Sequence, residues 1–218
     1  MRIRLWLPLL VCALAMSAQP AAADAIGVAS EDNLLYSVNL QTGALQPVLA
    51  LQNDEVLGDI AYLDGTLYMS SVTGAGGPFN IGTVNLTTGA VNPVGNPSAT
   101  FLGFQSLTAN PNADILYTVS LEPTQPLIAV SPNGSFQVIG PTNEFIRGLA
   151  YDTNHSILYG VDGGGRTSSL YSISTSTGAA ILIGNLGIAS GDEGLLYDSA
   201  ANILYLMTCS PKFSPAKT

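Results

Sequence analysis

The sequence has few of the residues on which catalytic and metal sites are usually built. It contains one histidine, His155, and two cysteines, Cys12 and Cys209, among 218 residues. A single histidine with no neighbouring cysteine excludes an ordinary zinc site. No Gly-x-Ser-x-Gly motif is found in the chain, which excludes the nucleophile elbow of a serine hydrolase. We therefore interpret His155 as a turn residue between two strands.

Basic residues are also scarce. The chain has six lysines and arginines against 15 aspartates and glutamates, which gives a formal net charge of −9. A surface this acidic repels the phosphates of nucleic acids and the headgroups of anionic lipids. We exclude both as partners and expect a protein or a carbohydrate ligand instead.

The only long apolar run lies at the N-terminus. Two arginines precede an apolar stretch from Leu5 to Met16, and Ala21-Ala22-Ala23 follows as a cleavage site of small residues. This is the pattern of a secretory signal peptide, and the stretch is too short to span a membrane. We predict a signal peptide over residues 1–23 and a secreted or periplasmic protein after cleavage near Ala23. Cys12 leaves with this segment, so no intrachain disulfide can form.

The rest of the chain shows one domain. No linker rich in proline or serine and no run of charge divides residues 24–207. Residues 208–218 hold two prolines and two lysines and lack a strand pattern, so we predict a loose tail there.

What is present in abundance is a repeat of about 45 residues. Pairs of the type Thr-Gly or Asn-Gly recur at nearly even steps, each between two short apolar runs; they are Thr42-Gly43, Thr88-Gly89, Asn133-Gly134 and Thr177-Gly178. Glycine after such a polar residue supplies the positive φ of a tight hairpin turn. Each pair therefore predicts a β-hairpin.

A second phrase alternates with the first. Its clearest copy is Gly148-Leu149-Ala150-Tyr151-Asp152, followed after a polar turn by Ile157-Leu158-Tyr159. Two short apolar runs around a polar turn predict another hairpin. Two hairpins per repeat make four antiparallel strands, and a period of 40–50 residues is that of a propeller blade. We predict an all-β protein, a β-propeller of about four to five four-stranded blades, without helices.

The repeat pattern does not decide whether the ring of blades is closed. The predicted domain begins in the middle of one repeat and its pattern stops after the first hairpin of another. The C-terminal hairpin can complete the N-terminal one and close a ring, which would remove exposed strand edges. The alternative is an open arc, a truncated fragment of a larger propeller.

The repeat resembles that of a family of secreted bacterial β-propeller proteins. The resemblance rests on Tyr171-Ser172-Ile173, on Thr177-Gly178-Ala179-Ala180 and on the Gly-Leu-Ala-Tyr-Asp phrase at Gly148. Such proteins are uncharacterised in function. The resemblance therefore implies a fold and export from the cell, and a propeller fold by itself hosts many functions.

Acidic residues gather in the loops that lead into the predicted innermost strands. These loops meet around the mouth of the central channel in a propeller, and the acids we select there are Glu55, Glu144, Asp192 and Glu193. Converging carboxylates are ligands that suit Ca²⁺, or they can hold a cationic or sugar ligand. The sequence thus offers a calcium site at the channel mouth as a hypothesis.

No complete catalytic set is recognisable in the sequence. We therefore predict a secreted, non-catalytic propeller that acts as a binding or surface-interaction module. The alternative is a propeller enzyme, such as a lactonase, a lyase or a quinoprotein, with a metal or cofactor at the central channel. A truncated fragment without a function of its own is the third interpretation.

Overall fold

The computed structural model contains only β-strands and turns among the residues that it describes. These residues are 2–6, 13–15, 24–29, 33–52, 56–72, 79–95, 103–104, 106–163, 167–188 and 193–208. Over these ranges no helix is long and apolar enough to cross a membrane. The prediction of an all-β chain without helices is confirmed.

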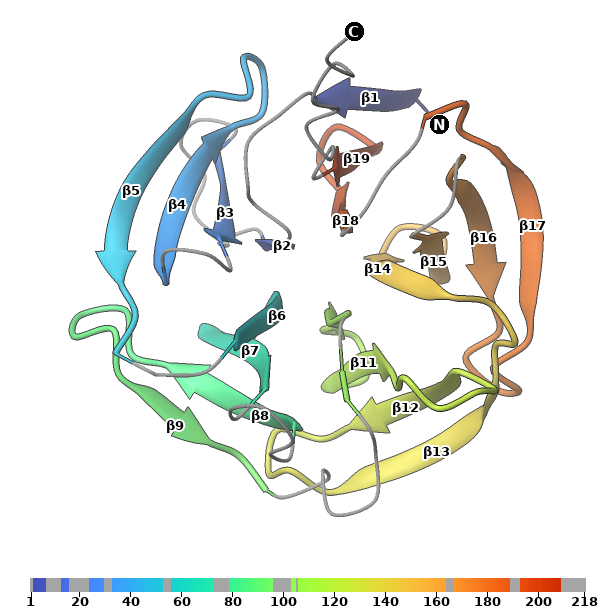
Figure 1. Ribbon diagram of the computed structural model, residues 1–218, viewed down its shortest axis with the longest axis horizontal. Coiled ribbons are helices and arrows are strands. Elements are labelled where there is room, and N and C mark those ends of the chain that lie inside the picture. Colours follow the sequence, from blue (N-terminus) through green and yellow to red (C-terminus); the bar gives the residue numbers. More distant parts are fainter. Residues whose placement is uncertain are drawn as a thin grey trace, which may run out of the picture.

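The strands form five sheets arranged around a centre (Figure 1). The second sheet contains β6 (Val56–Leu63), β7 (Thr66–Val72), β8 (Phe79–Val84) and β9 (Val91–Pro93). The third contains β10 (Thr108–Asn110), β11 (Ile115–Val119), β12 (Pro126–Val130) and β13 (Phe136–Pro141). The fourth contains β14 (Ile146–Asp152), β15 (Ile157–Asp162), β16 (Ser169–Ile173) and β17 (Ala180–Asn185). In each, the strands follow chain order from the centre to the rim and all pairs are antiparallel.

The first and last sheets use the two ends of the chain. The first contains β2 (Ala13–Ala15), β3 (Asp24–Ala29), β4 (Leu34–Asn39) and β5 (Leu45–Ala50). The last has the order β1-β19-β18, from β1 (Arg2–Trp6), β19 (Ile203–Thr208) and β18 (Glu193–Asp198). Strands β1 and β2 lie within the segment that we predict to be a signal peptide, and its cleavage stays a prediction. Residues 209–218 of the expected tail lie outside the described part.

The outer hairpins turn as the Thr-Gly and Asn-Gly pairs predict. The four glycines have φ values of 72° (Gly43), 77° (Gly89), 85° (Gly134) and 79° (Gly178), a region that side chains with a Cβ rarely adopt. Asparagine side chains stabilise two of these turns, because Oδ1 of Asn39 and Oδ1 of Asn85 each accept two backbone N–H groups. The local sequence therefore suffices to set each hairpin.

Apolar residues between neighbouring sheets form the core. Five separate buried clusters fill the five spaces between sheets, and leucine, isoleucine, valine and tyrosine dominate them. The repeated tyrosines Tyr68, Tyr117, Tyr159 and Tyr205 are buried in these clusters, as residues that pack at equivalent positions should be. The core thus follows the repeat of the sequence.

The last sheet meets the first without sharing a strand with it. Val38 and Leu40 of the first sheet pack against Leu196 and Tyr205 of the last. The C-terminal hairpin β18–β19 does not complete the N-terminal hairpin β4–β5, because the two lie in different sheets. Among the described residues the first and last sheets therefore share no strand, and the two ends of the chain pair only through β1 and β19 within the last sheet. That sheet has three strands where the others have four.

Candidate functional site

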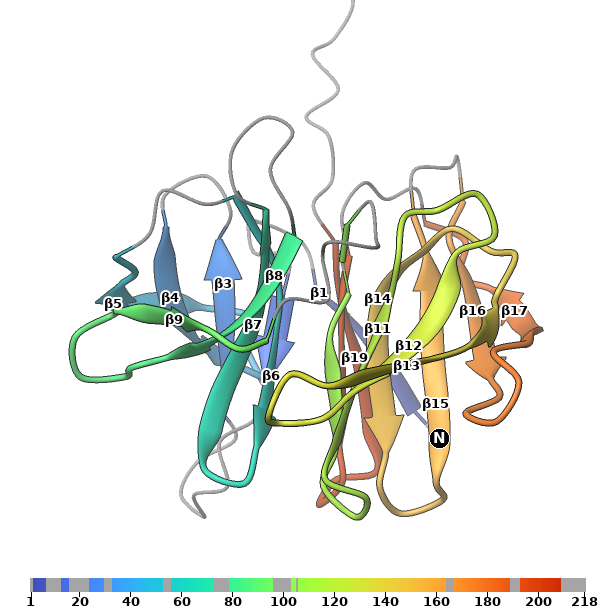
Figure 2. The same cartoon turned by 90° about the horizontal axis from the view of Figure 1, so that it is seen from below.

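The loop 142–145, which joins the third sheet to the fourth, lies on one face of the molecule, which we call the connection face (upper side of Figure 2). The β11–β12 turn shares this face, and the turns β6–β7, β14–β15 and β18–β19 lie on the opposite one. Of the four acids predicted at the channel mouth, Glu144 lies in this loop. The candidate site therefore has to be sought there.

Only one of these four acids has a described side chain. Glu55 and Asp192 lie outside the described residues, and Glu193 is described only as the first residue of β18. The carboxylate of Glu144 lies 3.2 Å from the hydroxyl of Tyr171, a residue of β16. The convergence of the four acids on one Ca²⁺ ion stays a prediction, as does the ion itself.

Glu144 shares its tyrosine partner with a second carboxylate. The Tyr171 hydroxyl also lies 3.2 Å from Oδ2 of Asp162, whose Oδ1 accepts the backbone N–H of Ser169 at 2.6 Å. Burial and the negative charges of Asp162 and Glu144 raise the pKa of Tyr171 to about 12. The hydroxyl therefore stays protonated at neutral pH and offers one hydrogen to two acceptors.

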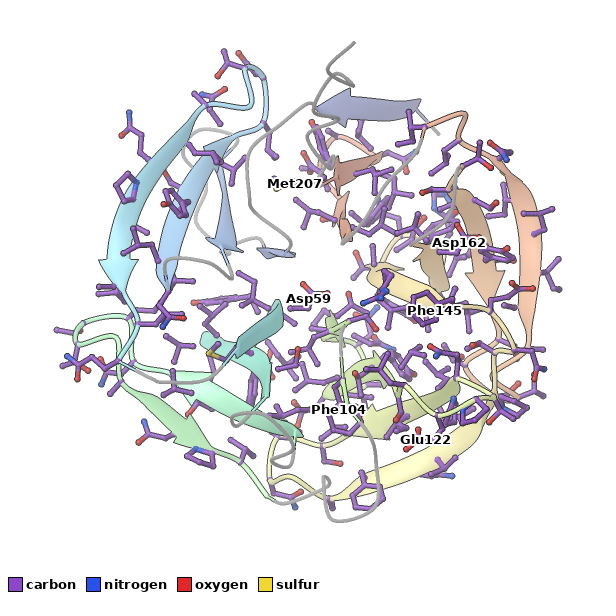
Figure 3. The ribbon with its side chains drawn as sticks, in the orientation of Figure 1. Asp59, Phe104, Glu122, Phe145, Asp162 and Met207 are labelled. Carbon is purple, nitrogen blue, oxygen red and sulfur yellow. The ribbon has the colours of Figure 1, made fainter. Side chains whose placement is uncertain are left out.

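An exposed aromatic ring lies next to this group in the chain. Phe145 has 42% of its surface exposed, and the guanidinium carbon of Arg147 lies 4.2 Å from the ring centroid. The two residues flank Ile146, which is buried and begins β14. Because Ile146 anchors the segment in the core, Phe145 and Arg147 are held at the start of the innermost strand β14; Phe145 is labelled in Figure 3. A cation at this distance from an aromatic face is attracted to it.

A buried carboxylate, Asp59, connects the second and third sheets close to the centre of the ring (Figure 3). Its two oxygens accept the backbone N–H groups of Ile60, at 2.9 Å, and of Leu107, at 2.8 Å. Its own N–H donates to Oγ of Ser70 at 2.8 Å. Burial raises the pKa of Asp59 well above its ordinary value, although the two hydrogen bonds from backbone N–H groups act to lower it. We assign Asp59 the role of an inter-sheet link, because its oxygens are occupied by backbone groups.

We expect Asp59 to make the stability of the protein depend on pH. With a raised pKa the folded state keeps a proton that the unfolded chain releases at about pH 4, so stability contributed by this group falls as pH rises from there. Asp59→Asn cannot titrate. The free energy of unfolding of the natural protein, measured in urea between pH 4 and 8, should therefore fall relative to that of the variant as pH increases. Parallel curves for the two proteins would contradict the raised pKa.

On the opposite face, His155 lies in the β14–β15 turn, as its sequence position predicts. Its Nδ1 lies 2.9 Å from Oδ2 of Asp152, whose Oδ1 accepts the N–H groups of Asn154 and His155. Burial acts to raise the pKa of Asp152, but hydrogen bonds from His155, Tyr197 and Asn154 outweigh it and hold the pKa below its ordinary value. Within the described ranges no three histidines, cysteines or acids gather as metal ligands. We therefore assign His155 and Asp152 the role of stabilising the β14–β15 turn.

A hollow of about 560 Å³ also opens on the opposite face. Thr66, Tyr68, Thr83, Asn85 and Asn92 line it, from the two hairpins of the second sheet. It lies away from Glu144 and Asp162 and has no charged residue in its lining. The connection face, in contrast, carries the charged groups Glu144, Asp162 and Arg147.

Two of the residues at the candidate site were not selected by sequence reasoning. From the sequence, Asp162 begins a glycine-rich segment that is typical of a loop between strands. Tyr171 is one of the tyrosines that repeat with the blades, and such a repeat predicts core residues. Tyr171 is indeed buried, but its hydroxyl reaches the edge of the sheet and meets both acids. No pattern in the sequence relates Glu144 to Tyr171, because 27 residues separate them.

No family model matches the sequence, and no curated protein matches it. Solved structures do. The chain is similar to one in a nidogen/laminin complex, with 11% identity, a TM-score of 0.62, and coverage of 92% of this chain and 86% of that one. It is similar to the calcium-binding protein regucalcin of Agrobacterium tumefaciens, with 16% identity, a TM-score of 0.60, and coverage of 96% and 71%. The PQQ-bound aldose sugar dehydrogenase of Streptomyces coelicolor gives 13% identity, a TM-score of 0.58, and coverage of 87% and 72%.

At these identities the likeness extends to the fold alone. The repeat type of the secreted bacterial family is not confirmed by any of these comparisons. They agree with the five sheets described above, and this chain has the fold of a β-propeller.

Proposed function

We propose that this chain is an exported, non-catalytic β-propeller that binds a carbohydrate on its connection face. One observation carries the proposal: an exposed phenylalanine, Phe145, follows directly on a carboxylate that shares a single hydroxyl proton with a second carboxylate. The Tyr171 hydroxyl can donate to only one acid at a time. Glu144 and Asp162 therefore retain acceptor capacity for the hydroxyl groups of a ligand.

The chemistry of these groups suits a sugar. An exposed aromatic ring offers a flat apolar surface for the C–H face of a pyranose. Carboxylates make strong, directional hydrogen bonds to hydroxyl groups, and the guanidinium of Arg147 adds donors beside the ring. An apolar surface with a few fixed polar groups is the usual composition of a small-molecule site.

The similar structures support this function in part. One of them is named as an aldose sugar dehydrogenase, and another belongs to a complex with the protein laminin. A protein ligand is thus the other kind of partner with support. We favour the sugar because the carboxylates of Glu144 and Asp162 can accept further hydrogen bonds from hydroxyl groups.

A binding assay with a matched control tests the proposal. We expect immobilised full-length protein to retain at least one neutral oligosaccharide from a panel of gluco-, manno-, xylo- and galacto-oligosaccharides. Phe145→Ala should weaken that binding at least tenfold, measured by isothermal titration calorimetry. Phe136→Ala removes an equally exposed ring, 40% exposed on the outer strand β13, and should change nothing. No retention of any sugar, or an equal loss in both variants, would refute carbohydrate binding at this site.

A propeller enzyme is the second candidate. The similarity to a PQQ-bound dehydrogenase supports it at least as well as it supports pure binding, because that protein has the same fold. The test is to add PQQ and Ca²⁺ to the protein with an aldose and an artificial electron acceptor, and separately to add a sugar lactone. Turnover that is lost in Glu144→Gln would replace the binding proposal by catalysis.

Export is tested independently of ligand binding. We expect the protein recovered from the periplasm or medium of a bacterial culture to begin at Asp24, as measured by intact mass. A mass that includes residues 1–23 would contradict cleavage near Ala23.

A further inference from the structure

Neighbouring sheets meet at the rim through the same contact each time. The end of one outer strand lies against the turn glycine of the outer hairpin of the next sheet. The pairs are Ala50 with Gly89, Gly95 with Gly134, and Gly140 with Gly178. A Cβ added to any of these glycines would overlap the backbone of the neighbouring sheet, which for Gly140 is the carbonyl of Thr177 next to Gly178. At the first of these junctions Gln52 donates its N–H to the oxygen of Gly89 at 2.8 Å. The rim thus joins the sheets by backbone contact.

The fourth sheet presents the same surface with nothing against it. Gly184 occupies in β17 the position that Gly140 occupies in β13, since each pairs with the equivalent leucine of its neighbouring strand, Leu170 or Leu127, beside a bulge. A Cβ added to Gly184 would meet no atom within 4 Å. The next sheet has no outer hairpin in its described part, so no turn glycine reaches Gly184.

The space for that hairpin begins beside β19. In the four complete sheets the third strand runs antiparallel to the second. In the last sheet the third place is taken by β1, which runs parallel to β19 and comes from the predicted signal peptide. The first sheet packs on the inner hairpin, through Val38 and Leu40, and leaves the outer half of the last sheet to other occupants. Removal of residues 1–23 would leave the edge of β19 without this strand.

The chemistry of an occupant of this place can be inferred from the outer hairpins of the other four sheets. None of the six basic and 15 acidic residues of the chain lies within 34–50, 79–95, 126–141 or 169–185. The rim is therefore built from uncharged strands joined by Thr-Gly or Asn-Gly turns. We infer from this composition that a hairpin occupying the same place in the last sheet is uncharged too.

We propose that the outer half of the last sheet, between the edge of β19 and Gly184, is a docking site for a β-hairpin of a partner polypeptide. The hairpin is uncharged, has a glycine in its turn, adds antiparallel to β19 and sets that glycine against Gly184. Main-chain hydrogen bonds along an open edge supply affinity in this mode of recognition, and side-chain fit supplies specificity.

A peptide with the sequence of residues 169–185 is the probe, because it is a complete outer hairpin of this chain. The protein is the full chain, natural or with Leu5→Pro, which removes the ability of β1 to pair with β19 opposite Leu206. Fluorescence anisotropy of the labelled peptide should show binding that is at least tenfold tighter in Leu5→Pro than in the natural chain. The same peptide with Gly178→Val should bind at least tenfold more weakly.

Variants of the protein localise the site. Gly184→Val fills the open space and should abolish binding of the peptide. Gln137→Val places the same side chain at an exposed position of β13, away from that space, and should not. Hydrogen exchange on Leu5→Pro with excess peptide should show protection of the amides of β19 relative to the same variant without peptide. Binding that Gly184→Val leaves unchanged would overturn the proposal, as would an absence of both peptide binding and β19 protection.

Discussion

Gly178→Ala is expected to lower the free energy of unfolding by about 2–4 kcal/mol. Two costs combine at this residue. Its φ of 79° is unfavourable for alanine, at about 1 kcal/mol. The added methyl group would also overlap the carbonyl of Gly140 in the neighbouring sheet, and relieving such an overlap costs about 1–3 kcal/mol. Urea denaturation of the natural protein and the variant measures the difference.

Gly65→Ala is the matched control for this prediction. Gly65 has nearly the same φ, 80°, but a Cβ added there would have nothing within 4 Å. It should cost about 1 kcal/mol, from the backbone alone. Equal losses in the two variants would mean that the contact between Gly178 and Gly140 adds nothing to stability, and that the sheets relax apart without cost.

Phe104→Ala is expected to lower the free energy of unfolding by about 3–5 kcal/mol, the usual cost of removing a buried aromatic side chain. Phe104 is fully buried between the second and third sheets, in a cluster with Ala61, Leu116 and Ile128. Its backbone also bridges to Ser120 at the end of β11. A small domain has about 5–15 kcal/mol of total stability, so this one change should strongly reduce the folded fraction near the melting temperature.

Phe145→Ala separates this effect from the loss of an aromatic ring as such. Phe145 is exposed on the connection face and contacts Arg147, so its replacement by alanine should lower the free energy of unfolding by about 1 kcal/mol or less. It should instead affect the binding of sugar. If Phe104→Ala were as mild as Phe145→Ala in urea denaturation, the space between the second and third sheets would have to be less tightly filled than described.

The hairpins could be predicted because their causes are local. A polar residue followed by glycine specifies a turn with positive φ, and apolar residues on each side specify two strands, as at Thr177-Gly178. The place of a terminal hairpin could not be predicted in the same way. Whether β18–β19 joins β4–β5 depends on contacts between the two ends of the chain, and the repeat pattern carries no information about those contacts.

The sequence was enough to predict which loop holds the candidate site, but not which side chains meet there. Glu144 was expected on the connection face because the loop before an innermost strand lies there. Its link to Tyr171 depends on the reach of a side chain across two strands, and the repeat pattern carries no information about that reach. Asp59 is harder still to predict, because an acidic side chain usually lies in water, and the contact that buries this one comes from the neighbouring sheet.

The glycine contacts at the rim also determine how such a chain can change in length. At each junction one sheet contributes the end of its outer strand and the next sheet contributes the turn glycine of its outer hairpin. These two parts are alike at all three junctions described above. Duplication of one unit of about 45 residues would therefore create a new junction from parts that already fit. Insertion of a fraction of a unit would leave a strand end without its turn. Descendants of this chain are expected to gain or lose whole blades, with stability changing in steps set by one interface at a time.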